Sequence, residues 1–312
     1  MSLDPVEAAR RPFVNEAPLT FGPQESAAMR AAAERVRQQL GQHYPLVIGG
    51  AQVSTSSQVT SRNPARPSET IGVHDEATVD LVDRLIGTAS AAFDTWRFAP
   101  VGERIGVLLG TAAAIREAKF DLCAWLGYEV GKNWAEADAE VAEAIDFLEY
   151  YAREALRLAE PPPPVQLAGE RDVFTYVPLG AGIVLPPWNF PLAILAGMTT
   201  AAVVSGNTVV LKPSPDAPTI AAIFVEMLQR AGLPAGVVTL CQGGADLGKA
   251  LVEHPRTRFI AFTGSKVAGL DINARAAVTR PGQRWIKRTI LEMGGKDAII
   301  LARDGDLDEA AT

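Results

Sequence analysis

Two polar side chains in the second half of the sequence could act on a carbonyl group. Asn189 stands in the segment PWNFP at 187–191, directly after an apolar, strand-like run, and its amide could donate a hydrogen bond to an oxyanion. Glu292 follows another such run and precedes a pair of glycines, where its carboxylate could act as a general base. Each residue also has a purely structural interpretation. Asn189 could cap the helix that follows, and the Glu292 carboxylate could accept hydrogen bonds from nearby backbone N–H groups.

A glycine-containing turn could hold a phosphate group. Gly264 and Ser265 stand at the expected start of a helix that reaches Gly269, and the free N–H groups of a helix start suit a phosphate or a pyrophosphate. The same residues are equally typical of a tight strand-to-helix turn. Gly244 and Gly248 resemble part of the G-x-G-x-x-G motif of dinucleotide-binding proteins, but an alanine interrupts the pattern, so this indication is weak.

One lysine ends a buried strand. Lys212 follows the apolar run Val209–Leu211, and its ammonium group could donate hydrogen bonds to the hydroxyls of a ribose. It could also simply reach solvent, which is the usual position of a lysine. Taken alone, Lys212 favours the solvent interpretation.

Strands and helices alternate from residue 180 onward, and this alternation must position the residues above. Apolar runs predict strands that end near residues 185, 211, 240, 262 and 291, and helical patterns cover 191–204, 217–231, 246–253 and 266–277. The alternation predicts an α/β fold with a doubly wound, Rossmann-like parallel sheet. Ligands of such sheets bind past the carboxyl ends of the strands, where all of these turns lie.

The first half of the chain is predicted to be mainly helical. We expect an extended arm over 1–24, helices over 25–42, 78–96, 101–131 and 134–158, short strands at 46–48 and 58–61, and a further strand at 171–177. The prolines at 161–164 end the last helix, because proline cannot continue one. Residues 173–211 carry no charged side chain, but the prolines among them exclude a single membrane-spanning helix.

Composition excludes several classes of protein. The 312 residues suffice for about two domains, and a formal net charge of −7 argues against a nucleic-acid partner. Two cysteines, Cys123 and Cys241, exclude a disulfide scaffold, and the three widely spaced histidines form no metal-binding pattern. Residues 1–16 contain no apolar core, so we expect no signal peptide and a cytoplasmic location.

Four motifs stand in an order and at a spacing that resemble the aldehyde dehydrogenase superfamily over almost the whole chain. They are Pro187–Pro191 (PWNFP), Lys212–Ser214 (KPS), Phe262–Ser265 (FTGS) and Leu291–Lys296 (LEMGGK). Within the superfamily, further segments are similar to the 1-pyrroline-5-carboxylate dehydrogenases, which oxidise glutamate γ-semialdehyde. Those segments are 13–16, 43–46, 147–153 and 281–288.

The resemblance implies a reaction and a role for each residue. In this superfamily a cysteine thiolate attacks the aldehyde, hydride passes to NAD, and water hydrolyses the resulting thioester. By motif, Asn189 corresponds to the oxyanion-binding amide, Glu292 to the base that activates water, and Lys212 to the ligand of the adenosine ribose. Gly264 and Ser265 correspond to the pyrophosphate turn. The other positions implied to line the dinucleotide are Leu185, Pro187, Trp188, Ser214, Gly244, Gly248, Phe262, Met293 and Gly294.

Three departures limit what the resemblance implies. The nucleophile of the superfamily lies in a motif beyond the present sequence, and neither Cys123 nor Cys241 stands in such a context, so we expect both to be structural. Pro215 stands where relatives often have an acidic residue, which leaves the preference between NAD and NADP open. Residues 266–268 and Gln242 also differ from the usual pyrophosphate-binding pattern.

The resemblance divides the chain into four parts. Residues 1–158 form an N-terminal arm and the helical part of the nucleotide-binding domain, 159–178 an oligomerisation flap strand, 179–293 the Rossmann-like NAD-binding core, and 294–312 the start of a truncated catalytic domain. It implies a homo-oligomer that acts on a small aldehyde, without nucleic acid, membrane or metal. The chain as given is expected to be inactive alone, because it lacks the nucleophile. Two alternatives stay open: a catalytically inactive NAD-binding fragment, and an aldehyde dehydrogenase for another aldehyde.

Overall fold

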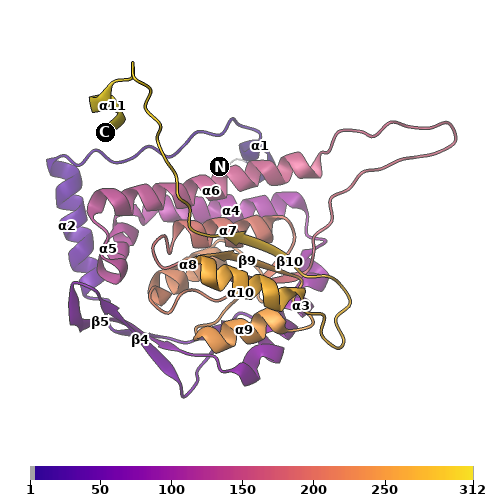
Figure 1. Ribbon diagram of the computed structural model, residues 1–312, viewed down its shortest axis with the longest axis horizontal. Helices are drawn as coiled ribbons and strands as arrows, with labels where there is room; N and C mark the ends of the chain where they lie inside the picture. The colour runs from indigo at the N-terminus through magenta and orange to yellow at the C-terminus, as the bar shows by residue number, and fades with distance from the viewer. Residues whose placement is uncertain (1–3, 312) are drawn as a thin grey trace.

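A seven-stranded sheet forms the centre of the protein in the computed structural model, which describes residues 4–311 (Figure 1). The strand order is β10-β9-β6-β7-β8-β2-β3. The parallel strands are β6 (Ala181–Leu185), β7 (Thr208–Leu211), β8 (Val238–Leu240), β9 (Phe259–Thr263) and β10 (Arg288–Glu292). At one edge the antiparallel strands β2 (Leu46–Ile48) and β3 (Ala51–Val53) complete the sheet. The predicted α/β fold with a doubly wound parallel sheet is confirmed.

Helices cover both faces of this sheet. One face carries α7 (Ala193–Val204) and α8 (Pro218–Arg230), and the other carries α3 (Val82–Trp96), α9 (Ala245–Glu253) and α10 (Lys266–Ala277). Val184 of β6 packs with the first group and Ile183 with the second, because successive side chains of a strand point to opposite faces. Burial on both faces explains why the strands read as continuous apolar runs.

An outer helical layer packs against α7 and α8. It consists of α4 (Val101–Glu117), α5 (Lys119–Val130) and α6 (Trp134–Ala159). The prediction of one helix over 101–131 is wrong, because the chain leaves the helical conformation at Ala118, with φ −94° and ψ 11°. Neither glycine nor proline marks this break, so the apolar periodicity alone does not show it.

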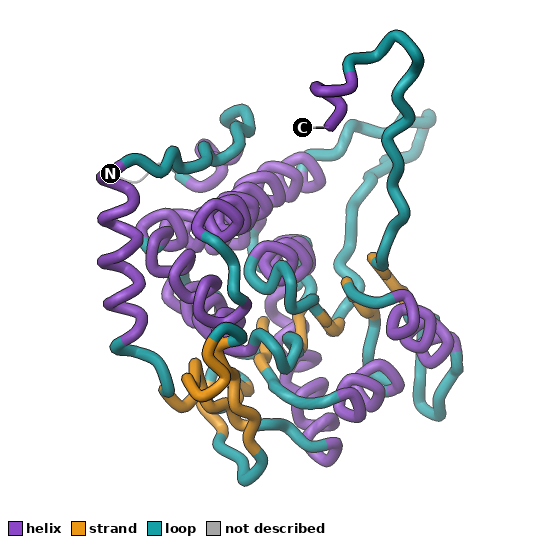
Figure 2. Tube along the Cα trace, turned by 60° about the vertical axis from the view of Figure 1, so that its left-hand side comes forward, coloured by secondary structure: helices purple, strands orange, loops and turns teal. Residues whose placement is uncertain are grey.

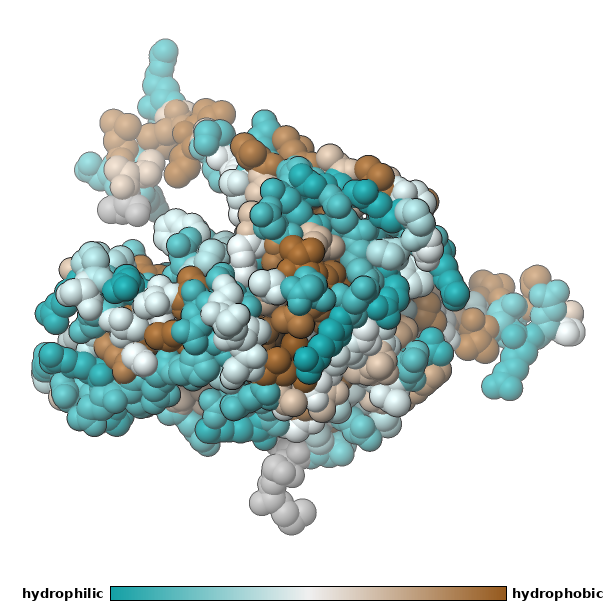
Figure 3. All heavy atoms as spheres, turned by 90° about the horizontal axis from the view of Figure 1, so that it is seen from below, coloured by the Kyte–Doolittle hydropathy of each residue, from teal (hydrophilic) through white to brown (hydrophobic). Residues whose placement is uncertain are grey.

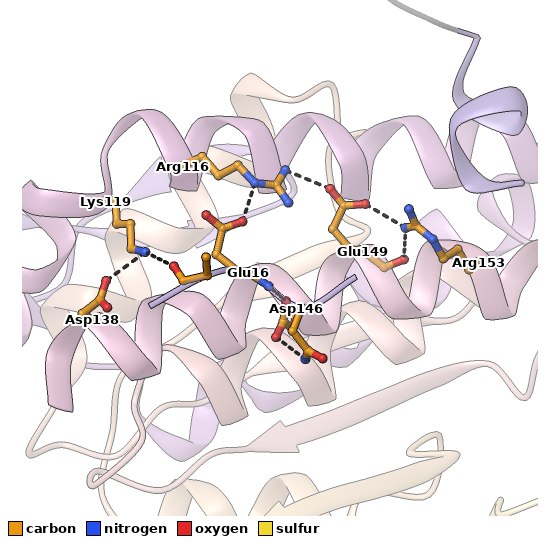
Figure 4. A network of polar contacts seen from close by, with 9 residues as sticks. Glu16, Arg116, Lys119, Asp138, Asp146, Glu149 and Arg153 are labelled. Carbon is orange, nitrogen blue, oxygen red and sulfur yellow. Dashed lines mark hydrogen bonds and ion pairs between the residues drawn. The ribbon is translucent and has the colours of Figure 1, made fainter. Parts of the chain in front are cut away.

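The N-terminal segment is less extended than predicted. It contains a short helix, α1 (Pro5–Ala9), because the Asp4 carboxylate accepts hydrogen bonds from the first N–H groups and proline suits the first helical position. The next helix is α2 (Pro23–Arg37). Between them the chain runs along α4 and α6, where Glu16 pairs with Arg116 and its backbone N–H donates to Asp146 (Figure 4).

A second, smaller sheet lies beside the main one and was largely missed from the sequence. Its order is β1-β5-β4, with β1 (Gln42–Tyr44), β4 (Gln58–Asn63) and β5 (Arg66–Asp75), and Figure 2 shows it apart from the main sheet. Only β4 was expected, as 58–61. The first half of β5 is polar and exposed, so no alternation of apolar residues marks it. A 3-10 turn, Val79–Leu81, then leads into α3.

Two segments leave the body of the protein. Residues 160–178 form a long projecting arm, and residues 293–306 lead away from β10 to the short helix α11 (Leu307–Ala311) (Figures 1 and 3). The strand predicted at 171–177 is absent, because no other strand among residues 4–311 lies beside this segment. Instead, Gln166 holds the arm's turn through hydrogen bonds with the backbone of Asp172. Both segments expose large apolar side chains, among them Val173, Phe174, Tyr176, Ile299 and Ile300.

A single glycine in β6, an interior strand of the main sheet, provides a test of this packing. A Cβ added to Gly182 of β6 would lie 2.1–2.4 Å from three ring atoms of Phe259 on β9. We expect Gly182→Ala to lower the free energy of unfolding by about 1–3 kcal/mol, as other overpacked cores do. Gly127→Ala in α5, where the new Cβ would meet only an ordinary contact at 3.5 Å, should be neutral or stabilising. Denaturant titration of both variants would contradict this packing if Gly182→Ala were as stable as Gly127→Ala.

Candidate active site

A cleft of about 980 Å³ opens where the strand order of the main sheet reverses. β6 lies next to β9 there, although two other parallel strands, β7 and β8, separate them in sequence. Ligands of open α/β sheets bind at such a switch point. Its walls are the segments that follow β6, β7, β9 and β10, together with α9 and the start of α10. The sheet topology thus gathers turns that the sequence spreads over more than a hundred residues.

Most of the predicted site residues line this cleft. They are Leu185, Pro187, Trp188, Asn189, Lys212, Ser214, Gly248, Phe262, Gly264, Ser265, Met293 and Gly294. Two predicted residues do not. Gly244 is the residue before α9, adjacent to Ala245, which does line the cleft. Glu292 lines a different pocket, described below.

Lys212 is a buried cation at the floor of the cleft. Its residue is 8% exposed, and its Nζ donates to the carbonyl oxygen of Pro213 at 3.2 Å. No carboxylate forms an ion pair with it among residues 4–311. Burial lowers the pKa of Lys212, because desolvation disfavours the charged form. A buried ammonium group with spare hydrogen-bonding capacity is suited to a polar ligand in the cleft.

The start of α10 faces the same cleft. Ser265 is its N-cap, and the Ser265 hydroxyl accepts a hydrogen bond from the N–H of Ala268 at 3.2 Å. The first turn carries no acidic residue. Like any first turn, it has N–H groups without partners inside the helix, and these attract an anion. The cleft is lined by four lysines (Lys212, Lys249, Lys266 and Lys296) and one aspartate, Asp271, so it is locally positive in an acidic protein.

Asn189 lies on an exposed loop between β6 and α7. The loop tip, Trp188 to Phe190, is exposed, whereas Pro191 and Leu192 are buried. The start of α7 has no cap from its own side chains. Instead the carboxylate of Glu140, from α6, accepts hydrogen bonds from the N–H groups of Leu192 at 2.7 Å and Ala193 at 3.3 Å.

A second buried carboxylate serves α8 in the same way. Glu129, from α5, accepts hydrogen bonds from the N–H groups of Thr219 and Ile220, each at 2.8 Å, and from the hydroxyl of Ser61 at 2.9 Å. Burial raises the pKa of Glu129, and these hydrogen bonds oppose that rise. The N-termini of α7 and α8 are therefore already occupied by carboxylates of the protein.

A second, apolar pocket of about 370 Å³ lies on the other side of the β9–β10 edge. Glu292 is its charged residue, and Thr263 lines both this pocket and the cleft. The remaining walls are mostly apolar side chains, including Phe147, Ile194, Met198 and Ile290. Glu292 thus contributes one carboxylate to an apolar pocket that adjoins a polar cleft.

Neither cysteine is placed for catalysis. Cys123 packs inside the helical layer and Cys241 on the opposite side of the main sheet, and both are free and buried. Burial raises the pKa of each thiol to about 12. At neutral pH both are therefore protonated and shielded, which agrees with the structural role predicted for them.

Sequence reasoning missed the residues that support the site rather than line it. Glu129 and Glu140 were not singled out, although Glu140 lies on the buried face of α6 with Ala137 and Ala144. The signal for Glu140 in the sequence is a charged residue at a position where the helical periodicity predicts a buried apolar one. No group of three or more metal-ligating side chains is present in the described part of the chain. Nor does any helix of residues 4–311 have the length and apolarity needed to span a membrane.

Fold and site together define the class of protein. A model of the aldehyde dehydrogenase family matches residues 52–312, and the chain belongs to this family. Its similarity to particular members is also high. The chain is 51% identical over 285 residues to 1-pyrroline-5-carboxylate dehydrogenase of Geobacillus thermodenitrificans (strain NG80-2), over 91% of this chain and 55% of that relative.

Solved structures agree with this assignment. The structure of 1-pyrroline-5-carboxylate dehydrogenase from Thermus with bound NAD superposes with a TM-score of 0.89 at 48% identity, covering 92% of this chain and 56% of that one. Proline utilization A of Bdellovibrio bacteriovorus gives a TM-score of 0.90 at 39% identity, covering 96% of this chain and 31% of that one. The chain therefore spans about half the length of the curated relatives that it matches.

The burial of both cysteines leads to a direct prediction. At pH 8 the native chain should react with a thiol reagent such as dithionitrobenzoate far more slowly than an exposed cysteine, because the thiolate fraction and the access are both low. In guanidinium chloride both thiols should react at once. The absorbance of the released chromophore gives the count. A thiol that reacts rapidly in the native chain would contradict the structural role of that cysteine.

Proposed function

We propose that the whole protein catalyses the NAD-dependent oxidation of L-glutamate γ-semialdehyde, the open form of 1-pyrroline-5-carboxylate, to L-glutamate. The observation that carries the proposal is the pairing of two hollows at Thr263: a positive cleft for a dinucleotide and an apolar pocket with one carboxylate, Glu292. The choice of substrate rests on the relatives that share about half of their residues with this chain and are named for it.

The cleft fits a nicotinamide dinucleotide. It offers an unpaired buried ammonium group at Lys212 and an uncharged helix start at Ser265, which match a ribose hydroxyl and a pyrophosphate. When bound, NAD supplies the hydride acceptor. Position 215, which is often acidic in relatives, is a proline in this chain and lines the cleft. A proline has no carboxylate that would repel the 2′-phosphate of NADP, so we infer that NADP is also accepted.

The proposed chemistry gives this chain two roles near the reacting carbon. The Asn189 side-chain amide donates a hydrogen bond to the oxygen that becomes negative after attack on the aldehyde. Glu292 removes a proton from the water that releases the acid. The attacking thiolate must come from outside these 312 residues, because both of their thiols are buried with pKa values near 12. On this proposal the chain alone binds the cofactor without turnover.

Other parts of the molecule would support a larger assembly. We propose that residues 1–158 and 179–293 form the nucleotide-binding unit, that 294–312 lead into a catalytic domain, and that the arm at 159–178 pairs with another subunit of a homo-oligomer. The arm's exposed apolar residues, and its lack of a strand partner within the described part of the chain, support that pairing. Two free cysteines are in keeping with a reducing, cytoplasmic location.

The role of Lys212 can be measured with the chain as it is. Lys212→Met keeps the aliphatic stem and removes the charge, so we expect NAD to bind about 1–3 kcal/mol more weakly. Lys287→Met is the matched control, because Lys287 is also buried and donates to a backbone carbonyl, of Val252, but does not line the cleft. Calorimetric titration with NAD and then NADP would exclude Lys212 from the cofactor site if both variants bound equally well.

The roles of Glu292 and Asn189 require a form of the protein that includes the catalytic half. Glu292→Gln keeps the shape but not the basicity, so stopped-flow absorbance should show a first burst of NADH and then almost no steady turnover. Asn189→Ala removes an oxyanion donor, so the burst itself should slow by about 10²–10³-fold. Normal steady turnover in Glu292→Gln would reduce Glu292 to a structural carboxylate. No semialdehyde oxidation by the unmutated form would overturn the proposed function.

A further inference from the structure

Two charged side chains of the helical layer contact the segment that carries Asn189. Glu140 of α6 is fully buried, and one of its oxygens accepts both N–H groups at the start of α7, from Leu192 and Ala193. Its other oxygen lies 2.6 Å from the Nζ of Lys132, which precedes α6 and whose side chain is 12% exposed. Burial raises the pKa of Glu140, and the Lys132 charge opposes that rise.

The same ammonium group also contacts the loop tip. Lys132 Nζ lies 3.8 Å from the centroid of the Phe190 ring, a cation–π contact. Phe190 is the neighbour of Asn189 in the chain, and it is 40% exposed, so few other groups restrain it. Lys132 and Glu140 together therefore contact the loop on both sides of Pro191, at the residue after Asn189 and at the first turn of α7.

We propose that the Lys132–Glu140 ion pair is a positioning device that fixes Asn189 and Phe190 at the mouth of the active site. The inference rests on the proposed function, since it assigns the pair to the reaction through Asn189. A hydrogen-bond donor that stabilises an oxyanion must be held closely, because a displacement of about 1 Å can cost roughly a hundredfold in rate. The Asn189 side chain makes no hydrogen bond of its own among the described residues, so neighbouring anchors must set its position.

Stability alone is a poor reason for this pair. Burying two charges costs several kcal/mol, and apolar residues of similar volume are often as stabilising. The two charged groups make directional contacts that apolar side chains cannot make. The carboxylate accepts two backbone N–H groups with defined direction, and the ammonium group attracts an aromatic ring that is otherwise exposed.

Amide hydrogen exchange, measured on the present chain, tests whether the Lys132–Glu140 pair fixes the loop that carries Asn189. In Lys132→Met and in Glu140→Gln we expect the Leu192 and Ala193 amides to exchange about 10–100-fold faster, as expected when a charge-assisted hydrogen bond weakens. Lys119→Met is the matched control. It breaks another buried ion pair between α5 and α6, Lys119–Asp138 at 2.9 Å, which lies along the N-terminal segment and not at the α7 start (Figure 4). Unchanged exchange at these two amides in Lys132→Met, or an equal rise in the control, would overturn the proposal.

A second measurement separates positioning from general stability. In the form that includes the catalytic half, Lys132→Met should slow the NADH burst about 10–100-fold while NAD affinity changes less than about twofold. Lys132→Arg, which keeps the charge, should recover most of the burst rate. A loss of NAD affinity equal to the loss of rate, or no recovery with arginine, counts against the positioning role. If the unmutated form oxidises no semialdehyde, the proposed function fails, whereas the exchange result still decides whether the pair holds the loop.

Discussion

Two buried carboxylates connect the helical layer to the sheet, and the rest of the site depends on them. Glu129 of α5 and Glu140 of α6 each accept two backbone N–H groups, at the starts of α8 and α7 respectively. Such a cap contributes about 1–2 kcal/mol, which helps to offset the cost of burying the charge. Because both helices follow strands that end at the cleft, these contacts also set where the β6 and β7 loops lie.

The caps also decide which part of the cleft attracts an anion. A helix N-terminus carries about half a positive charge, and a carboxylate placed on it cancels much of that field. With Glu140 and Glu129 occupying α7 and α8, the start of α10 at Ser265 keeps its field, because its first turn has no acidic residue. The ammonium group of Lys212 lines the same cleft. The cleft is therefore locally positive although the protein as a whole is acidic.

The sequence was sufficient to predict the parallel strands and the residues that line the cleft. It was insufficient to predict the buried carboxylates that cap the helices behind the cleft. Apolar runs and turn residues predicted all five parallel strands, and twelve of the fourteen site residues named from motifs line the cleft. The break at Ala118 and the polar strand β5 left no periodic signal. Glu129 and Glu140 could not be assigned from local pattern, since the helix-start N–H groups that they accept lie 52 or more residues away and only the tertiary fold brings them together.

The end of β10 shows how a strand can serve two hollows with successive residues. Side chains alternate between the faces of a strand, so Ile290 and Glu292 share one face and line the apolar pocket, whereas Met293 lines the cleft. A one-residue shift in the pairing of β10 with β9 would move the Glu292 carboxylate to the side of the cleft. The register of Glu292 with Thr263 therefore separates the Glu292 carboxylate from the lysine-lined cleft. Thr263 lines both hollows and marks where they adjoin. On the proposed function, a hydride acceptor in the cleft and a water molecule beside Glu292 would approach the same carbon from the two sides of this residue.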